Sequence, residues 1–387
     1  MNRKEFTTAA TGQLVPVQLA TGKDWAFVPH QLPPEWSFPS SLWPLLAEAK
    51  EALGTLNGIG QTLSDHQLLL RPLQNREAIS SSSIEGTYVT PEQLLLYELD
   101  PRDAESASDR AADWNEVFNY NRALVQGCEL LKTLPVCNRL VREMHGILMT
   151  GVRGHYKNPG QFRDCQVQIG SQARFVPPPS ETAKTCINDL EKYLNEEDQQ
   201  FDPLVRCFLV HYQFEAIHPF ADGNGRVGRA LLALMIYKLL GHAMPWLYMS
   251  AYYEQFRDEY MQFLFQVSAR GDWQNWIEFC LRGTVIQAKD SIRRCHQFNA
   301  LRADFHARVD TPTPRTHAQI EGLFQSPVVT IPSLSKNFDV AYHTAQMDIE
   351  RLASVGILHE FPDEYPRTFV AREIMKIAYG PASVVET

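Results

Sequence analysis

The stretch HPFADGNGRVGR, residues 218–229, stands directly before the apolar run ALLALMIYKLLG, residues 230–241, which has the composition of a helix. Its Gly-Asn-Gly segment predicts a turn whose free backbone N–H groups lead into the start of that helix. Arg226 and Arg229 are three residues apart, so they share a face of the first turn, where the helix dipole is already positive. Two arginines there are unfavourable unless an anion binds. The stretch therefore predicts an anion site at a helix N-terminus.

Two other residues of this stretch carry chemistry. Asp222 lies just before the expected helix, and Mg²⁺ prefers one or two carboxylates together with phosphate oxygens. His218 precedes Asp222 by four residues, and a histidine near a bound phosphate can accept a proton from an incoming hydroxyl. Taken singly, a histidine at a helix end and an aspartate in a turn are common structural residues. Their convergence with glycines and arginines within twelve residues favours a phosphate-transfer site.

The glycines of the stretch also spell G-x-G-x-x-G, the pattern of a dinucleotide site, at Gly223, Gly225 and Gly228. That pattern requires a preceding strand and an acidic residue about twenty positions later. The upstream segment, residues 204–220, has helical spacing instead, and the next acidic residue after Gly228 is Glu254. The Walker A pattern is absent as well. A Rossmann site and a P-loop are therefore both disfavoured.

The stretch matches every defined position of a longer pattern, H-x-F-x-[DE]-G-N-G-R-x-x-R. In this respect the chain resembles the Fic family. The resemblance implies an all-helical Fic core that transfers AMP from ATP to a Ser, Thr or Tyr hydroxyl of a target protein and of itself, releasing pyrophosphate. A relative of the family has Lys in place of the second glycine of the Gly-Asn-Gly segment and transfers phosphate instead. Gly225 stands at that position here, which favours AMP transfer. The implied partners are ATP, Mg²⁺ and a target protein.

The resemblance also implies a role for each residue of the stretch. His218 would deprotonate the attacking hydroxyl, Asp222 would hold Mg²⁺, and Phe220 would anchor the loop in the core. The residues that would cradle the phosphates of ATP are Gly223, Asn224, Gly225, Arg226 and Arg229. General chemistry agrees, because in-line attack on phosphorus depends mainly on positioning and on neutralising the leaving pyrophosphate.

Upstream of this stretch, VQIGSQARFVPPP, residues 167–179, alternates around a Gly-Ser turn and predicts a short β-hairpin. It resembles the flap of Fic proteins, which aligns a target segment by strand pairing. The alternative is an ordinary surface hairpin. Gly160, Phe162 and Arg163 resemble the segment that leads into the flap and are interpreted as structural.

The first region of the chain contains two helical patterns, and the second ends in SSSSIEG with Gly86 as a stop signal. Ser81, Glu85 and Gly86 match the inhibitory pattern [ST]-x-x-x-E-[GN] of Fic proteins. The resemblance implies that the acid reaches Arg229, occupies the γ-phosphate position and so restrains transfer. The same glutamate could instead help water to remove AMP from a modified protein. Without the family context, the serine run is compatible with a simple loop.

The sequence divides into three regions: 1–105 with the inhibitory helix, 106–300 as the Fic core, and 305–387 after the polar segment DTPTPRTH. The last region has a pattern of three helices and a strand pair, which predicts a winged-helix domain. Between residues 315 and 376 acidic residues outnumber basic ones by two, which is a poor footprint for DNA. A regulator whose winged-helix domain does the work, with a core that only binds nucleotide, remains the alternative function.

The composition of the chain limits the classes of protein to which it can belong. The 387 residues are 44% hydrophobic and carry a net charge of −9, which argues against nonspecific binding to nucleic acid or membrane surfaces. Seven cysteines without a C-x-x-C pair suit reduced thiols, and no apolar run is long enough to span a bilayer. We therefore expect a cytoplasmic protein. The helical patterns along the chain and the resemblance to the Fic family imply a mainly α fold. The sequence leaves the oligomeric state open, a homodimer included.

Overall fold

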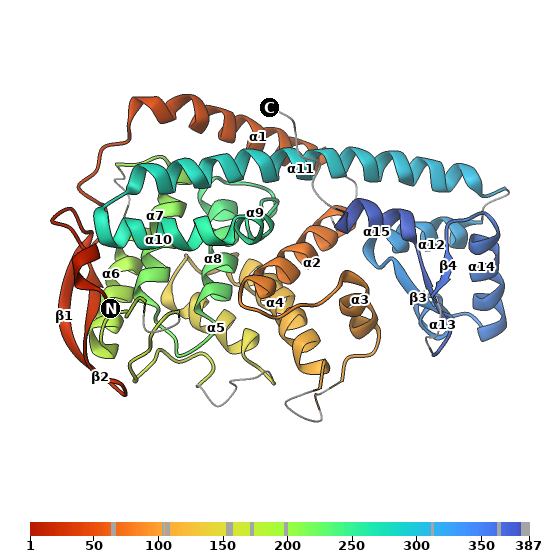
Figure 1. Cartoon of the computed structure of the whole chain (residues 1–387). Helices are drawn as coiled ribbons and strands as arrows, with labels where there is room; N and C mark the ends of the chain where they lie inside the picture. The colour runs from red at the N-terminus through yellow and green to blue at the C-terminus, as the bar shows by residue number, and fades with distance from the viewer. Residues whose placement is uncertain are drawn as a thin grey trace.

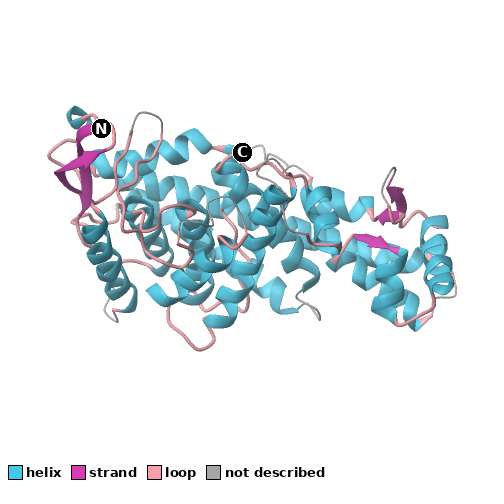
Figure 2. Cartoon of the chain, turned by 90° about the horizontal axis from the view of Figure 1, so that it is seen from below, coloured by secondary structure: helices cyan, strands magenta, loops and turns pink. Residues whose placement is uncertain are grey.

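The structure is a computed structural model that describes residues 1–62, 67–102, 104, 109–151, 158–170, 174–196, 200–310, 313–361 and 365–380. Helices dominate, and the strands are confined to two opposite ends of the molecule (Figure 2). The expected mainly α class is confirmed. Within the described residues, no helix combines the length and the apolar character that crossing a bilayer requires.

An antiparallel β-hairpin at the N-terminal end was not anticipated from the sequence. Strand β1, Gly12–Leu19, pairs with β2, Gly22–Pro29, around a two-residue turn, and a short 3₁₀ turn η1, Arg3–Glu5, precedes it. The backbone N–H of Phe27 in β2 donates to the carbonyl of Val176 at 2.8 Å. The β1–β2 hairpin therefore contacts the C-terminal part of the expected flap segment.

The two helical patterns of the first region form as expected. After the 3₁₀ turn η2, Ser40–Leu42, come α1, Trp43–Thr62, α2, Gln67–Ile84, and α3, Pro91–Leu99. At the end of α2 the N–H groups of Gly86 and Thr87 donate to the carbonyls of Ser83 and Ser82, respectively, in the pattern of a Schellman motif. Gly86 has φ +95°, a backbone angle that L side chains rarely adopt. Glycine at this position thus ends the helix directly after Glu85.

The central region is a helical bundle. Its helices are α4, Ala111–Leu130; α5, Asn138–Leu148; α6, Ser180–Asn195; α7, Pro203–Ile217; α8, Asn224–Leu239; α9, Ser250–Gln255; and α10, Arg257–Arg270. Helices α7 and α8 pack against each other and are buried around most of their circumference. This burial explains why their sequences are apolar on nearly all faces. The pair forms the centre of the core.

The segment expected to form the flap is only partly described. Ile169 and Phe175 form an isolated antiparallel bridge, with reciprocal backbone hydrogen bonds of 2.8 and 3.2 Å. The turn of the expected hairpin, residues 171–173, lies outside the described residues. The bridge agrees with a hairpin register, and its use as a flap stays a prediction.

Helix α11, Trp273–Arg308, runs along most of the molecule with α1 beside it (Figure 1). It continues past residue 300, where the sequence suggested a boundary, so the chain leaves the long helix only after Arg308. The other boundary, at residues 105–106, lies outside the described residues. The division into three regions stays a prediction.

The C-terminal region contains more elements than the sequence indicated. In chain order they are α12, Pro314–Gln325; β3, Val328–Thr330; α13, Ile331–Phe338; α14, Tyr342–Ser354; β4, His359–Phe361; β5, Thr368–Val370; and α15, Arg372–Tyr379. The three strands form an antiparallel sheet in the order β3-β5-β4. The three expected helices and the strand pair are present, and β3 and α15 are added. Assignment to the winged-helix class stays a prediction.

A buried ion network joins this region to α2. Asp290 of α11 accepts from Arg76 of α2 at 2.5 Å and from Arg294 at 2.8 Å. Arg294 also donates to the carbonyls of Ala378 and Gly380 at the end of α15. Because α2 carries Glu85 at its end, this network contributes to the position of that residue.

Candidate active site

The stretch 218–229 connects the C-terminus of α7 to the N-terminus of α8. His218 caps α7 in the left-handed conformation, with φ 51° and ψ 62°, while its N–H donates to the carbonyl of Phe214. Positive φ is uncommon for residues other than glycine and is often found where function constrains the backbone. This turn directs the chain away from the α7 axis, and the His218 side chain lines a cavity.

The loop is fastened from within by Asn224. Its Oδ1 accepts from the N–H of Phe220 at 2.8 Å, and its Nδ2 donates to the Phe220 carbonyl at 2.9 Å. The Phe220 ring is fully buried and stacks on His145 at 3.8 Å between ring centroids. Phe220 therefore anchors the loop, as expected. Asn224, expected among the phosphate-binding residues, has both amide atoms engaged with the loop and shapes it.

His145 supports the loop from α5. Its Nδ1 accepts from the N–H of Gly160 at 2.8 Å, so Nε2 carries the hydrogen and donates to the carbonyl of Asp222 at 3.1 Å. Burial lowers the pKa of His145 to about 4, which keeps the ring neutral at pH 7. This residue was not anticipated from the sequence.

Arg163 holds the other side of the loop. Its side chain is almost fully buried and donates to the carbonyls of His218 at 2.8 Å, Cys165 at 2.9 Å and Pro178 at 2.5 Å. Its backbone N–H donates to Pro219 at 2.9 Å. One guanidinium thus fixes the backbone of His218 relative to the C-terminal part of the expected flap segment, in line with the structural role expected for Arg163.

The N-terminus of α8 carries Gly223 and Arg226, two of the residues expected to bind an anion. Gly223 is its N-cap, with φ 73°, and a side chain there would press on Met149 and Leu148. Arg226 forms an ion pair with the buried carboxylate of Glu116 at 2.8 Å and lies 3.8 Å from Asp222. The charge of Arg226 is therefore already balanced in part by Glu116, a residue of α4 that the sequence did not single out.

Arg229 meets the residues of the expected inhibitory pattern. Its Nε donates to Ser81 Oγ at 2.9 Å, and its Nη2 donates to the Ser81 carbonyl at 2.9 Å and to Glu85 Oε1 at 2.8 Å. A β-carbon on Gly225 would lie 2.2 Å from Glu85 Oε1, so only glycine leaves room for this carboxylate. The structure thus brings Ser81, Glu85, Gly225 and Arg229 together.

Electrostatics keep the Glu85–Arg229 pair ionised. Burial by itself would raise the pKa of Glu85, but the charge of Arg229 and its hydrogen bond outweigh burial and lower it. Arg229 is buried, and the charge of Glu85 raises its pKa. The carboxylate of Glu85 is thus the counter-charge that Arg229 has in this structure.

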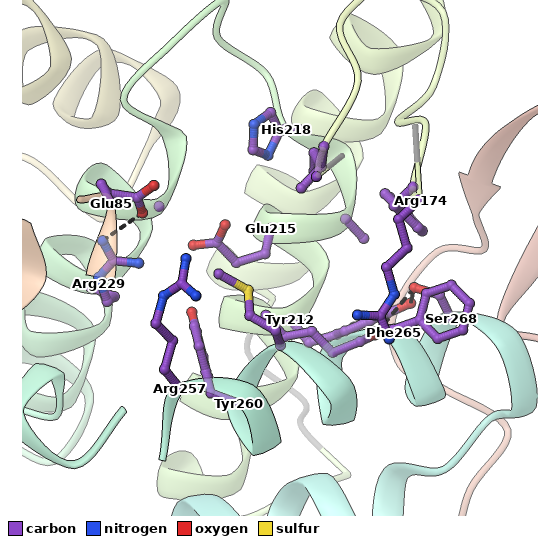
Figure 3. A pocket seen from close by; sticks show the side chains of 17 residues that line it. Glu85, Arg174, Tyr212, Glu215, His218, Arg229, Arg257, Tyr260, Phe265 and Ser268 are labelled. Atoms are coloured by element: carbon purple, nitrogen blue, oxygen red, sulfur yellow. Dashed lines mark hydrogen bonds and ion pairs between the residues drawn. The ribbon is translucent and has the colours of Figure 1, made fainter. Parts of the chain in front are cut away.

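One cavity of about 340 Å³ joins these groups (Figure 3). Glu85, Arg229 and Gly225 lie at one end, and His218 lies beside them on the wall formed by α7. The opposite end holds Phe265 together with Arg174 and Ser268 (Figure 3), and the apolar side chains of the whole lining are Ile169, Phe175, Met261, Leu264 and Phe265. The combination of a charged end and a largely apolar remainder suits a ligand with an anionic part and a flat organic part.

His218 is protonated only in acid. Burial lowers its pKa to about 4, and the charge of Arg163 acts in the same direction. At neutral pH the imidazole therefore has a free lone pair and can accept a proton from a hydroxyl.

Three further residues of the cavity were not anticipated from the sequence: Glu215, Arg257 and Tyr260. Glu215 lies on α7 three residues before His218, the cap of that helix, and this closeness in the sequence was the available signal for Glu215. Arg257 and Tyr260 come from α10, and no local pattern connects that helix to the loop. Arg257 donates from Nε to the carbonyl of Ile84 at 3.0 Å and so contacts the end of α2.

Two matches to known domains identify the family. Residues 43–129 match the Fic/DOC family N-terminal domain, and residues 135–236 match the Fic/DOC family domain. The second match contains the loop from His218 to Arg229 and the helices on both sides of it. The chain belongs to the Fic/DOC family.

Curated relatives carry names consistent with this family. Over 78 residues the chain is 38% identical to protein adenylyltransferase fic-1 of Caenorhabditis elegans, covering 20% of this chain and 15% of the relative. It is 32% identical over 121 residues to protein adenylyltransferase Fic of Aedes aegypti, covering 31% and 22%, respectively. The chain thus spans only about a fifth of the length of these relatives.

Solved structures agree on the fold. A Fic family protein from Desulfovibrio desulfuricans G20 superposes with a TM-score of 0.56 at 21% identity, covering 88% of this chain and 98% of that chain. Fic-1 from C. elegans superposes with a TM-score of 0.51 at 22% identity, covering 64% and 73%, respectively. The arrangement of helices around the loop is therefore that of Fic proteins.

Proposed function

We propose that this chain is a protein adenylyltransferase that transfers AMP from ATP to a Ser, Thr or Tyr hydroxyl of a target protein and of itself. The observation that carries the proposal is one cavity in which a neutral histidine, His218, lies beside Gly225 and Arg229 of the α8 N-terminus. A proton acceptor next to a preformed anion site is what phosphoryl and nucleotidyl transfer require. The names of the relatives support the same reaction.

In the proposed reaction the target hydroxyl attacks the α-phosphorus of ATP. A bond forms between the hydroxyl oxygen and the α-phosphorus, the bond to the β-phosphate oxygen breaks, and pyrophosphate leaves. His218 accepts the hydroxyl proton. Arg226, Arg229 and the backbone N–H groups at the start of α8 stabilise the charge of the pyrophosphate.

The loop between α7 and α8 offers a carboxylate that suits Mg²⁺. Asp222 offers a carboxylate that is 36% exposed, although its Oδ1 also accepts from the N–H of Gly223 at 2.7 Å. One such carboxylate together with phosphate oxygens suits this ion, which keeps several of its own waters. When bound, Mg²⁺ would supply additional neutralisation of the phosphates. No cluster of three acidic, cysteine or histidine side chains that could hold a metal by itself occurs among the described residues.

The proposal includes restraint of transfer by Glu85. Its carboxylate already accepts a hydrogen bond from Arg229. ATP must therefore compete with Glu85 for this arginine or bind in a pose that keeps the γ-phosphate away from it. Ser81 reinforces the contact through two hydrogen bonds to the same arginine. Removal of AMP from a modified protein by water, assisted by Glu85, is compatible with the same geometry.

Incubation of the full chain with α-³²P-labelled ATP and Mg²⁺ tests the proposal, with and without Glu85→Gly. We expect label on protein, more strongly in the variant, and none with Glu85→Gly/His218→Ala. If Glu85→Gly binds ATP but transfers no label to itself or to proteins of a cell extract, the chain is a nucleotide-binding regulator and the proposal is wrong.

A further inference from the structure

The two ends of the cavity define where each part of a nucleotide would lie. Arg229 and Gly225 mark the phosphate end, and the opposite end holds Phe265, an aromatic side chain that suits a flat base. Figure 3 shows these ends on opposite sides, with α7 between them. The sugar, which connects phosphates to base, would lie along the middle of α7.

Tyr212 and Glu215 of α7 line the cavity, and so does His218, the residue that caps this helix. Tyr212 and Glu215 are three residues apart, so the step between them advances about 4.5 Å along the helix and keeps nearly the same face. Figure 3 draws the Glu215 carboxylate between His218 and Tyr260, near the centre of the cavity. The sequence motif and the proposed reaction assign no role to this carboxylate.

Glu215 has an unsatisfied acceptor. Its Oε1 is buried and has no hydrogen-bond partner among the residues that the structure describes. The atom lies against Gly228, where a β-carbon would be 2.3 Å away, so the absence of a side chain at Gly228 creates the space that Glu215 fills. The hydroxyl of Tyr260 faces the same cavity but is bonded to His211 Nε2 at 2.9 Å.

The surroundings make an unpaired carboxyl here unfavourable. Burial raises the pKa of Glu215 to about 7, and although Arg229 opposes this effect, the charge of Glu85 adds to it. A buried polar group without a partner costs roughly 1 to 3 kcal/mol in a folded protein. A ligand that donates a hydrogen bond to Glu215 would remove this cost.

Resting on the proposed function, we propose that Glu215 accepts a hydrogen bond from a ribose hydroxyl of the bound ATP and so selects ribonucleotides over deoxyribonucleotides. The 2′- and 3′-hydroxyls are the donors in the middle of ATP, whereas the amino group of adenine lies at the far edge of the base. In dinucleotide-binding folds a carboxylate accepts a hydrogen bond from the ribose 2′-hydroxyl, so a glutamate is a suitable partner for this group.

The test is calorimetric binding of ATP, 2′-deoxy-ATP and 3′-deoxy-ATP with Mg²⁺ to the full chain carrying Glu85→Gly, which frees Arg229. We expect at least one deoxynucleotide to bind about 10- to 100-fold more weakly than ATP, the range for a hydrogen bond to a charged group. Adding Glu215→Ala should abolish this difference, mainly by weakening ATP. Glu215→Gln keeps an acceptor oxygen and should retain a difference of several-fold.

Ser268→Ala is the matched control, because Ser268 lines the same cavity at the end opposite Arg229 and should leave the ratio of affinities unchanged. Equal binding of all three nucleotides to Glu85→Gly would overturn the inference and leave the proposed function intact. The inference is also wrong if the difference survives Glu215→Ala, or if both Glu215 variants weaken all three nucleotides equally. Failure of every nucleotide to bind would overturn the proposed function and the inference together.

Discussion

The carboxylate of Glu85 accepts a hydrogen bond from Nη2 of Arg229 at 2.8 Å, although the two residues are 144 positions apart in the chain. Glu85 is the residue directly after α2, and Arg229 lies in the second turn of α8. The end of one helix thus supplies the counter-charge for the anion site at the start of another.

Glu85→Gly is expected to increase AMP transfer. The substitution removes the anion that competes for Arg229, so the triphosphate can adopt the reactive pose. The variant also leaves the buried Arg229 without this counter-charge, but because Glu85 itself is 36% exposed the loss of stability should stay below the roughly 3 to 5 kcal/mol of a fully buried pair. Transfer from α-labelled ATP, including self-modification, measures the gain.

The double variant Glu85→Gly/Arg229→Ala provides the control for this pairing. It should show no gain over wild type, because Arg229, which Glu85→Gly would free to bind the triphosphate, is absent from the double variant. A double variant as active as Glu85→Gly, or a Glu85→Gly protein no more active than wild type, would contradict the inhibitory pairing.

His218→Ala is expected to lose transfer while it still binds ATP. The substitution removes the proton acceptor and leaves the α8 N-terminus and Asp222 in place, so the loss should be about 10²- to 10⁴-fold in rate. Single-turnover transfer in the Glu85→Gly background and calorimetric binding separate the two effects. Undiminished transfer would exclude His218 as the base.

Asp222→Ala is expected to weaken the response to Mg²⁺. With the carboxylate gone, more Mg²⁺ should be needed for half-maximal transfer, and a high concentration should restore part of the activity. Titrating Mg²⁺ in the transfer assay measures this shift. An unchanged Mg²⁺ dependence would show that Asp222 is not a ligand.

Buried histidines predict that stability falls in acid. Burial lowers the pKa of His145 to about 4 and that of His211 to about 3, whereas both groups titrate near 6.5 in an unfolded chain. Between those values the unfolded state binds more protons, so the free energy of unfolding should decrease as the pH falls from about 6.5 towards 4. Above pH 6.5 these two residues should have little effect on it.

Denaturant unfolding at pH 7.5, 6 and 5 measures this dependence. His145→Gln removes one of the buried histidines that titrate in this range and should make the decrease shallower, whatever its effect on absolute stability. An identical pH dependence in the variant and the wild type would rule out His145 as a contributor.

Asp290→Ala is expected to destabilise the protein by about 3 to 5 kcal/mol, the usual effect of removing one partner from a buried ion pair. Asp290 and Arg294 are 6% and 2% exposed, and the variant would leave Arg294 and Arg76 without this counter-charge. Denaturant unfolding measures the loss. Asp290→Asn keeps acceptor oxygen at the same place and should lose less, and a loss below about 1 kcal/mol in the alanine variant would show that the network is dispensable.

The sequence by itself determined the local features of the site. The left-handed stop at Gly86, the glycine N-cap at Gly223 and the start of α8 all follow from preferences of single residues and their neighbours. The helical character of the central region was likewise readable, because apolar spacing along α5, α7 and α8 is a property of each segment alone.

The β1–β2 hairpin was missed although a local signal existed. Val15, Val17 and Leu19 alternate and pack on a small apolar cluster with Ala26 and Val176. Pro16 lies between them, and proline is a signal against a central strand. A two-stranded sheet with no third strand tolerates proline because one edge of each strand has no strand to pair with.

Only the tertiary structure decided which distant residues share the cavity. The inhibitory pattern at Ser81 and Glu85 is short, and its contact with Arg229 depends on how α2 packs between α4, α8 and α9. Glu215 carries no motif, and its unpaired oxygen becomes evident only once Gly228 and Tyr260 are placed around it. Local sequence encodes backbone conformation through short-range sterics, whereas the pairing of charges across a core depends on the packing of whole helices, which no single segment specifies.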